Sequence, residues 1–106
     1  MKRPILDVAR VVRSKNSGPF ELVLDIMFKD RAVFETVRDT DQITPRRIAD
    51  LYGLPEDQVK RVIFFPPSLA VKVVMPRQIV SGAPGDSDVY GAQQHAPLLN
   101  LDFELP

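Results

Sequence analysis

The segment formed by residues 20–29 constrains the fold more than any other part of the chain. Its apolar side chains recur at every second position: Phe20, Leu22, Leu24, Ile26 and Phe28. Successive side chains of a β-strand point to opposite faces of a sheet, so this two-residue period predicts a strand with one buried face. We therefore expect these five side chains in the core of a β-containing domain.

Four further segments have the composition or alternation of β-strands. The run ILDVARVVR is rich in β-branched residues, and RVIFF ends at two prolines, which cannot donate hydrogen bonds to a ladder. Apolar residues also alternate in two later segments. The expected strands are residues 5–13, 61–65, 69–75 and 98–105.

Two helix start signals lie between the second and third expected strands. Asp30 can cap a helix whose apolar residues recur at spacings of three and four. Thr44 followed by Pro45 is a second start, because proline at the first helical position loses no hydrogen bond. Gly53 can end that helix in a left-handed conformation, and a further helical turn begins at Pro55.

The expected order of elements is β-β-α-α-β-β-long loop-β. Strands at both ends of the chain and a helical pair in the middle favour an α+β fold. We expect a mostly antiparallel sheet of about five strands with the helical pair on one face. The other connections are short, which favours a single domain over residues 1–106.

Composition excludes several classes of protein. The chain has 106 residues and no cysteine, which excludes disulfides, thiolate metal sites and cysteine nucleophiles. Its 14 basic and 14 acidic side chains give a net charge of zero, whereas a nucleic-acid binder needs a basic surface. No segment approaches the ~20 apolar residues of a membrane span. The charged start does not resemble a signal peptide, so we expect a soluble cytoplasmic domain.

The charges are nevertheless separated along the chain. All lysines and arginines lie at or before Arg77, whereas residues 78–106 contain four acidic side chains and no basic one. Coulomb attraction predicts that this acidic segment lies against the basic body. Chance is an equally good explanation in so short a chain.

Residues 78–97, QIVSGAPGDSDVYGAQQHAP, form an expected connection of unusual length. Loops beyond about 12–15 residues are uncommon in compact domains, and they are usually functional or disordered. This one has an aromatic residue and the only histidine but no lysine or glutamate, unlike most disordered segments. We expect an ordered loop that faces a ligand.

Gly85, Asp86 and Asp88 have the composition of an oxygen-rich metal loop. Two carboxylates one residue apart suit a divalent cation such as Mg²⁺ or Ca²⁺, and His95 can complete a transition-metal site. The spacing does not match an EF-hand. The alternative, which we favour, is that the two aspartates form turns with nearby backbone N–H groups and structure the loop.

His95 is the default general acid or base, because only its unperturbed pKa lies near neutrality. The alternative is a hydrogen-bonded structural histidine. Gln93 and Gln94 can donate to and accept from a carboxylate or hydroxyl, and Tyr90 can stack on a ligand or pin the loop. These residues are the candidate substrate-binding groups of the loop.

Ser14, Lys15 and Asn16 begin a second candidate segment, the expected turn of residues 14–19. Consecutive turn residues can direct N–H groups at an anion, and Lys15 adds a positive charge. The segment lacks the glycines of a P-loop, so nucleotide hydrolysis is not indicated. The alternative is a hairpin turn with a solvated lysine.

Several strings resemble a small domain family of unknown function: RSKNSGPFELVLDIMF, Thr44-Pro45, LYGLP and above all GDSDVYGAQQHAPLL. The resemblance covers the chain from about Leu6 to Leu105. That family occurs beside, or fused to, proteins resembling the acyclic terpene utilisation protein A. The resemblance implies a larger partner of this kind, in catabolism of branched or hydroxylated organic acids, and implies no reaction.

The expected function is that of an accessory or substrate-binding subunit of a two-component metabolic enzyme. In this hypothesis residues 85–95 and the 14–18 turn form a pocket for a small organic acid or acyl substrate, with His95 transferring the proton. The alternative is a non-catalytic assembly module that docks through the long loop and an edge strand, and that can also join copies of the domain. A metal-dependent lyase or hydrolase is a third hypothesis.

Overall fold

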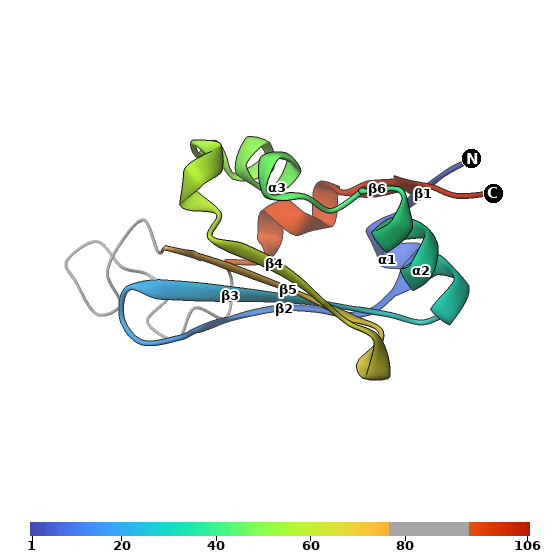
Figure 1. The fold of residues 1–106 in the computed structure, drawn as a ribbon, viewed down its shortest axis with the longest axis horizontal. Helices are drawn as coiled ribbons and strands as arrows, with labels where there is room; N and C mark the ends of the chain where they lie inside the picture. Colours follow the sequence, from blue (N-terminus) through green and yellow to red (C-terminus); the bar gives the residue numbers. More distant parts are fainter. Residues whose placement is uncertain (77–93) are drawn as a thin grey trace.

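The chain folds into two antiparallel sheets and several short helices, in a computed structural model that describes residues 1–76 and 94–106 (Figure 1). The elements are β1 (Lys2–Pro4), α1 (Ile5–Val8), β2 (Ala9–Asn16), β3 (Glu21–Phe28), α2 (Arg31–Asp39), α3 (Pro45–Tyr52), η1 (Glu56–Gln58), β4 (Arg61–Phe65), η2 (Pro66–Ser68), β5 (Ala70–Pro76), η3 (Ala96–Asn100) and β6 (Asp102–Glu104). Here η marks a 3-10 helix.

The larger sheet has the strand order β2-β3-β5-β4, and β1 pairs with β6 in the smaller one. Both sheets are antiparallel throughout. The helices α1, α2 and α3 and the β1–β6 pair lie on one side of the four-stranded sheet (Figure 1). This arrangement confirms the predicted α+β fold, with the strands divided between two sheets.

The alternation in β3 builds the core as the sequence predicts. Leu22, Leu24, Ile26 and Phe28 are buried beneath the helices, where they join apolar side chains from β5, α2, α3, η3 and β6. Phe20 is a correction, because it is 65% exposed and precedes the strand. Within the described residues the β3–β5 ladder begins at Glu21, opposite Pro76, and does not include Phe20.

The two predicted helix starts are confirmed by their caps. The Asp30 carboxylate accepts a hydrogen bond from the Ala32 N–H, and the Thr44 hydroxyl accepts one from the Arg47 N–H. Gly53 ends α3 with φ of 68°, in the left-handed region where a residue without Cβ is unstrained. Both helices therefore begin with a local side-chain hydrogen bond.

Two predicted strands are shorter than the sequence indicates. Residues 5–8 form the helical turn α1 rather than a strand, and the Ile5 N–H donates to the Leu101 carbonyl at 3.0 Å. Residues 96–100 form η3, and only 102–104 form strand β6. Pro97 lies at the start of η3 and has no N–H to donate to a strand ladder. The Ile5–Leu101 hydrogen bond instead joins the two helical segments.

Gln42 covers the outer edge of the short strand β6. Its side-chain Nε2 donates to the Glu104 carbonyl at 2.8 Å, and its Oε1 accepts from the Glu104 N–H at 2.7 Å. The Arg47 guanidinium donates to the Asp102 carbonyl and lies over the Phe103 ring. Because β1 pairs with the opposite edge, β6 is held from both sides.

Candidate functional site

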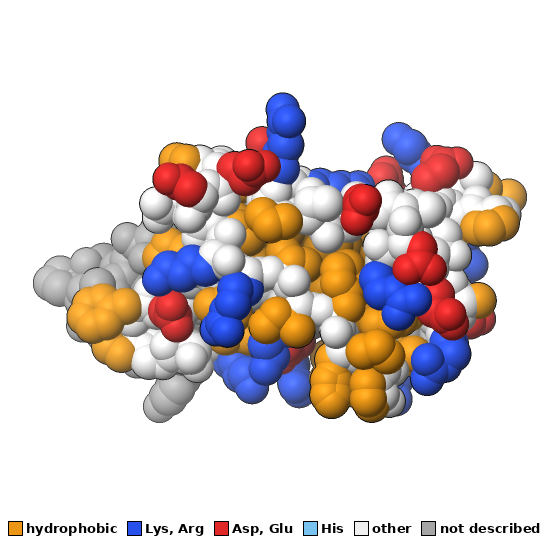
Figure 2. All heavy atoms as spheres, in the orientation of Figure 1, with side chains coloured by type: hydrophobic (Ala, Val, Ile, Leu, Met, Phe, Trp, Pro, Cys, Tyr) orange, Lys and Arg blue, Asp and Glu red, His pale blue; other side chains and the backbone are white. Residues whose placement is uncertain are grey.

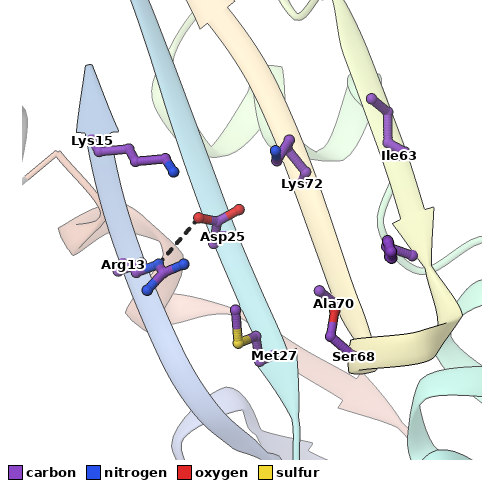
Figure 3. A pocket seen from close by; sticks show the side chains of 9 residues that line it. Arg13, Lys15, Asp25, Met27, Ile63, Ser68, Ala70 and Lys72 are labelled. Carbon is purple, nitrogen blue, oxygen red and sulfur yellow. Dashed lines mark hydrogen bonds and ion pairs between the residues drawn. The ribbon is translucent and has the colours of Figure 1, made fainter. Parts of the chain in front are cut away.

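The face of the four-stranded sheet that points away from the helices carries a hollow of about 270 Å³ (Figure 3). We call it the sheet pocket. It is lined by side chains of all four strands and of η2: Arg13, Lys15, Asp25, Met27, Ile63, Phe65, Ser68, Ala70 and Lys72. No described helix covers this face.

Strand register brings the charged residues of the sheet pocket into one row. Arg13 lies opposite Asp25, and Asp25 lies opposite Lys72. Lys15 lies two residues beyond Arg13 on β2 and therefore on the same face. Figure 3 shows the three basic side chains arranged around Asp25.

Asp25 is the buried charge of this face, with only 4% of its surface exposed. A buried carboxylate requires a charged or hydrogen-bonding partner. The Arg13 Nε supplies it, donating to the Asp25 Oδ2 at 3.1 Å. This ion pair neutralises the charge of Arg13 and leaves those of Lys15 and Lys72.

Lys15 and Lys72 form no ion pair with any residue that the structure describes. The other acidic residue of β3, Glu21, pairs with Lys60 at 3.2 Å. The part of the pocket lining that the structure describes therefore has an excess of two positive charges. An anion is the ligand that such a lining attracts.

The other end of the sheet pocket is apolar. Met27 lies opposite Ala70, and Ala70 lies opposite Phe65, in the row next to the charged one. Ile63 extends the charged row at its β4 end. The pocket thus places two ammonium groups beside an apolar wall, an arrangement that fits a ligand with an anionic head and a hydrocarbon body.

The structure separates the members of the predicted 14–18 turn. Residues 14–16 continue β2, pairing with residues 22–24 of β3, and the turn begins only at Ser17. Alternation along the strand sends Lys15 into the sheet pocket. Ser14 is buried toward the other face, and neither it nor Asn16 lines the pocket.

The candidate residues of the long connection lie mostly outside the described residues. Those outside are Gly85, Asp86, Asp88, Tyr90 and Gln93. His95 directly precedes η3, which packs against α1 and α3 on the covered side of the sheet. His95 does not line the sheet pocket, and its role in proton transfer stays a prediction.

Tyr52 holds the chain just before His95. Its hydroxyl donates to the Gln94 carbonyl at 2.7 Å. Burial raises the pKa of the Tyr52 hydroxyl above its usual value, because the phenolate would lose its hydration. Tyr52 therefore acts as a neutral hydrogen-bond donor that positions the start of η3.

Two absences hold only for the described part of the chain. Within residues 1–76 and 94–106, no group of three acidic or histidine side chains is close enough to hold a metal ion. Asp86 and Asp88 fall outside that search. None of the helices in the same residues is long and apolar enough to cross a membrane.

The acidic C-terminal segment does contact the basic body where it is described. Asp102 lies 3.4 Å from Arg47, and Glu104 lies 2.8 Å from the N-terminal amine. Both pairs are substantially exposed, so each contributes little to stability.

The structure defines a small α+β domain with basic side chains around a pocket on the sheet face that no described helix covers. The chain belongs to the family described as domain of unknown function DUF4387, whose model matches residues 5–102. No curated protein and no solved structure matches it.

Proposed function

We propose that this domain binds a small organic acid in the sheet pocket, as the accessory or substrate-binding subunit of a cytoplasmic two-component metabolic enzyme. The observation that carries the proposal is the pair Lys15 and Lys72, which lack a described counter-ion and stand beside an apolar wall. A carboxylate between the two ammonium groups would receive charge-assisted hydrogen bonds. Its hydrocarbon part would lie on Met27, Ile63 and Phe65.

The size of the hollow supports a small ligand. Sites for drug-sized molecules occupy roughly 300–1,000 Å³. The sheet pocket, at about 270 Å³, lies just below that range. A short branched or straight-chain acid is small enough for this volume.

The proposal is tested by titrating butanoate, isovalerate and hexanoate into the domain, followed by the amide NMR shifts of β2 and β5. We expect saturable shifts that weaken roughly ten- to a hundredfold in Lys72→Ala, because a hydrogen bond to a charged group contributes about 1.5–3 kcal/mol. Lys2→Ala is the matched control, since Lys2 is an exposed lysine on β1 and does not line the pocket. Equal weakening in both variants, or no saturation with any acid, would contradict the proposal.

The larger partner is the second part of the proposal. The resemblance given above implies a protein like the acyclic terpene utilisation protein A. Co-purification of the two proteins at micromolar concentrations is the expected result. Failure to associate would leave the acid-binding part standing and remove the two-component part.

The second candidate function is a non-catalytic assembly module. The observation that favours it is the apolar outer edge of β4, described next. This function requires no ligand in the sheet pocket, so association without acid binding would support it over the first.

A further inference from the structure

The two edges of the four-stranded sheet differ in how well they are protected against pairing with another strand. β2 forms one edge and β4 the other. An edge strand presents unpaired N–H and C=O groups, and proteins usually protect such edges with charges, bulges or prolines. Comparing the two edges within the described residues therefore indicates which edge is less protected.

The β2 edge is protected. Its pairing with β3 is interrupted by a bulge between Ala9 and Val11. Three basic residues follow along it: Arg10, Arg13 and Lys15. A second strand would have to desolvate or displace these charges.

The β4 edge has an apolar centre. Ile63 is 40% exposed and Phe65 is 48% exposed, and the one charged residue of the strand, Arg61, lies at its start. Within the described residues β4 pairs only with β5. Figure 2 shows apolar side chains gathered where β4 runs into η2.

We propose that β4 pairs antiparallel with β4 of a second copy of this chain, in a two-fold register centred on Ile63. This inference is independent of the proposed ligand. In this register Ile63 lies opposite Ile63 of the second copy, and Arg61 lies opposite Phe65. An isologous contact of this kind closes as a dimer.

The ends of the strand select this register. Pro66 and Pro67 follow β4 directly and have no N–H to donate, so pairing cannot extend beyond Phe65. Only the register centred on Ile63 pairs all five residues of one strand with all five of another. A shift that placed Arg61 opposite its own copy would oppose like charges, which destabilises a strand pair.

Both faces of the joined sheet would be complementary. On the pocket side each Arg61 guanidinium would stand beside a Phe65 ring, a cation–aromatic pair. On the helix side Val62 would lie opposite Phe64, and both are already half-buried. Because Phe65 lines the sheet pocket, the second copy's Arg61 would stand at the wall of that pocket.

The absence of cysteine makes the register directly testable. Side chains directly opposite in an antiparallel pair have Cβ atoms about 4.5–5.5 Å apart, within reach of a disulfide after small adjustment. We expect Ile63→Cys to form a covalent dimer on mild oxidation. Arg61→Cys and Phe65→Cys should each stay monomeric alone, because residues four positions apart along a strand are ~13 Å from each other. A mixture of these two variants should cross-link.

Val11→Cys, on the protected β2 edge, is the control. Sedimentation equilibrium of the unmodified chain should show a concentration-dependent dimer. Ile63→Lys should weaken its association roughly tenfold or more, because it opposes two like charges at the centre. Circular dichroism checks that the variant is folded.

Two outcomes would overturn the proposal. One is a monomer at every concentration, with Ile63→Cys cross-linking no faster than Val11→Cys. The other is equal cross-linking of all three single β4 variants, which would show unspecific collision. Acid binding by such a monomer would leave the proposed function intact, so the two failures are distinguishable.

Discussion

Asp25 lowers the positive charge of the sheet pocket, because among residues 1–76 and 94–106 it is the one acidic side chain that lines it. Its carboxylate neutralises part of the charge of Arg13, Lys15 and Lys72. An arriving anion is therefore attracted by the lysines and repelled by Asp25. The balance between these terms fixes the affinity of the pocket for anions.

Asp25→Asn is expected to tighten binding of small carboxylates, because it raises the charge of the pocket lining by one unit. In the unmodified chain the Arg13 Nε lies 3.1 Å from the Asp25 carboxylate, and the amide of the variant still offers it an oxygen acceptor. Titrations at low and high salt measure the effect, which should shrink as screening increases. A weaker affinity in Asp25→Asn would mean that Asp25 itself contacts the ligand.

Tyr52 makes the stability of the domain depend on pH in the alkaline range. The pKa of its hydroxyl is raised in the folded state by burial, whereas the unfolded chain keeps an ordinary value of about 10. Below that value neither state loses the proton, and the contribution to stability is complete. Above it only the unfolded state ionises, so stability falls as pH rises, by at most about 1.4 kcal/mol per pH unit.

Tyr52→Phe should separate this effect from other alkaline titrations. We expect it to cost about 1 kcal/mol at neutral pH through loss of the hydrogen bond to Gln94, and to flatten the decline above pH ~10. Urea unfolding between neutral and alkaline pH measures both. An unchanged decline in the variant would mean that Tyr52 is not the cause of the pH dependence.

At the level of elements, the sequence predicts best those segments whose signals are local. Asp30 and Thr44 cap the helices they precede, and β4 has the predicted bounds. The segments wrongly predicted as strand, residues 5–8 and 98–100, instead belong to helical turns that contact each other although they are far apart in sequence. Apolar composition alone cannot distinguish a helical turn that packs on a sheet from a strand within it.

The sheet pocket was missed for a related reason. Arg13, Asp25 and Lys72 lie on three strands, and only the register of β2, β3 and β5 brings them together. The sequence does contain a signal. Asp25 lies on the face of its strand opposite the apolar face, and Lys72, which stands between two valines, lies on the corresponding face of its own strand. Pairing partners were needed to show that these two residues are neighbours.

Gln42 provides a test of how β6 is held. Gln42→Ala removes both hydrogen bonds to the Glu104 backbone, and we expect a loss of about 1–2 kcal/mol in the free energy of unfolding. Hydrogen exchange of the Glu104 amide should accelerate in parallel. Gln58→Ala is the control, because Gln58 is an exposed glutamine on η1, and it should leave both quantities unchanged. Equal effects would mean that solvent replaces the Gln42 amide.

At the scale of the whole molecule, the two sheets share one core. Edge-to-face contacts connect Phe103 to Phe28, Phe28 to Phe34 and Phe34 to Phe64, with ring centroids 5.6–6.3 Å apart. This aromatic chain runs from β6 through β3 and α2 to β4. We therefore expect a perturbation of the small sheet to affect the far edge of the large one.

Removal of residues 102–106 tests whether the chain behaves as a single domain. The truncation deletes Phe103, which is fully buried, and exposes the side of Phe28 that it covers. Loss of one buried phenylalanine costs about 3–5 kcal/mol, a large part of the ~5–15 kcal/mol that stabilises a typical domain. We expect the truncated chain to lose its cooperative thermal transition.

Phe103→Leu keeps the test informative even if the truncated chain does not fold. It should lower the stability while preserving a single transition observed at both β6 and β4, because both strands pack on one aromatic core. If instead β6 melts first and the amides of β2 to β5 keep their protection, the β1–β6 pair is an appendage. In that case the four-stranded sheet and its two helices α2 and α3 would form the cooperative unit by themselves.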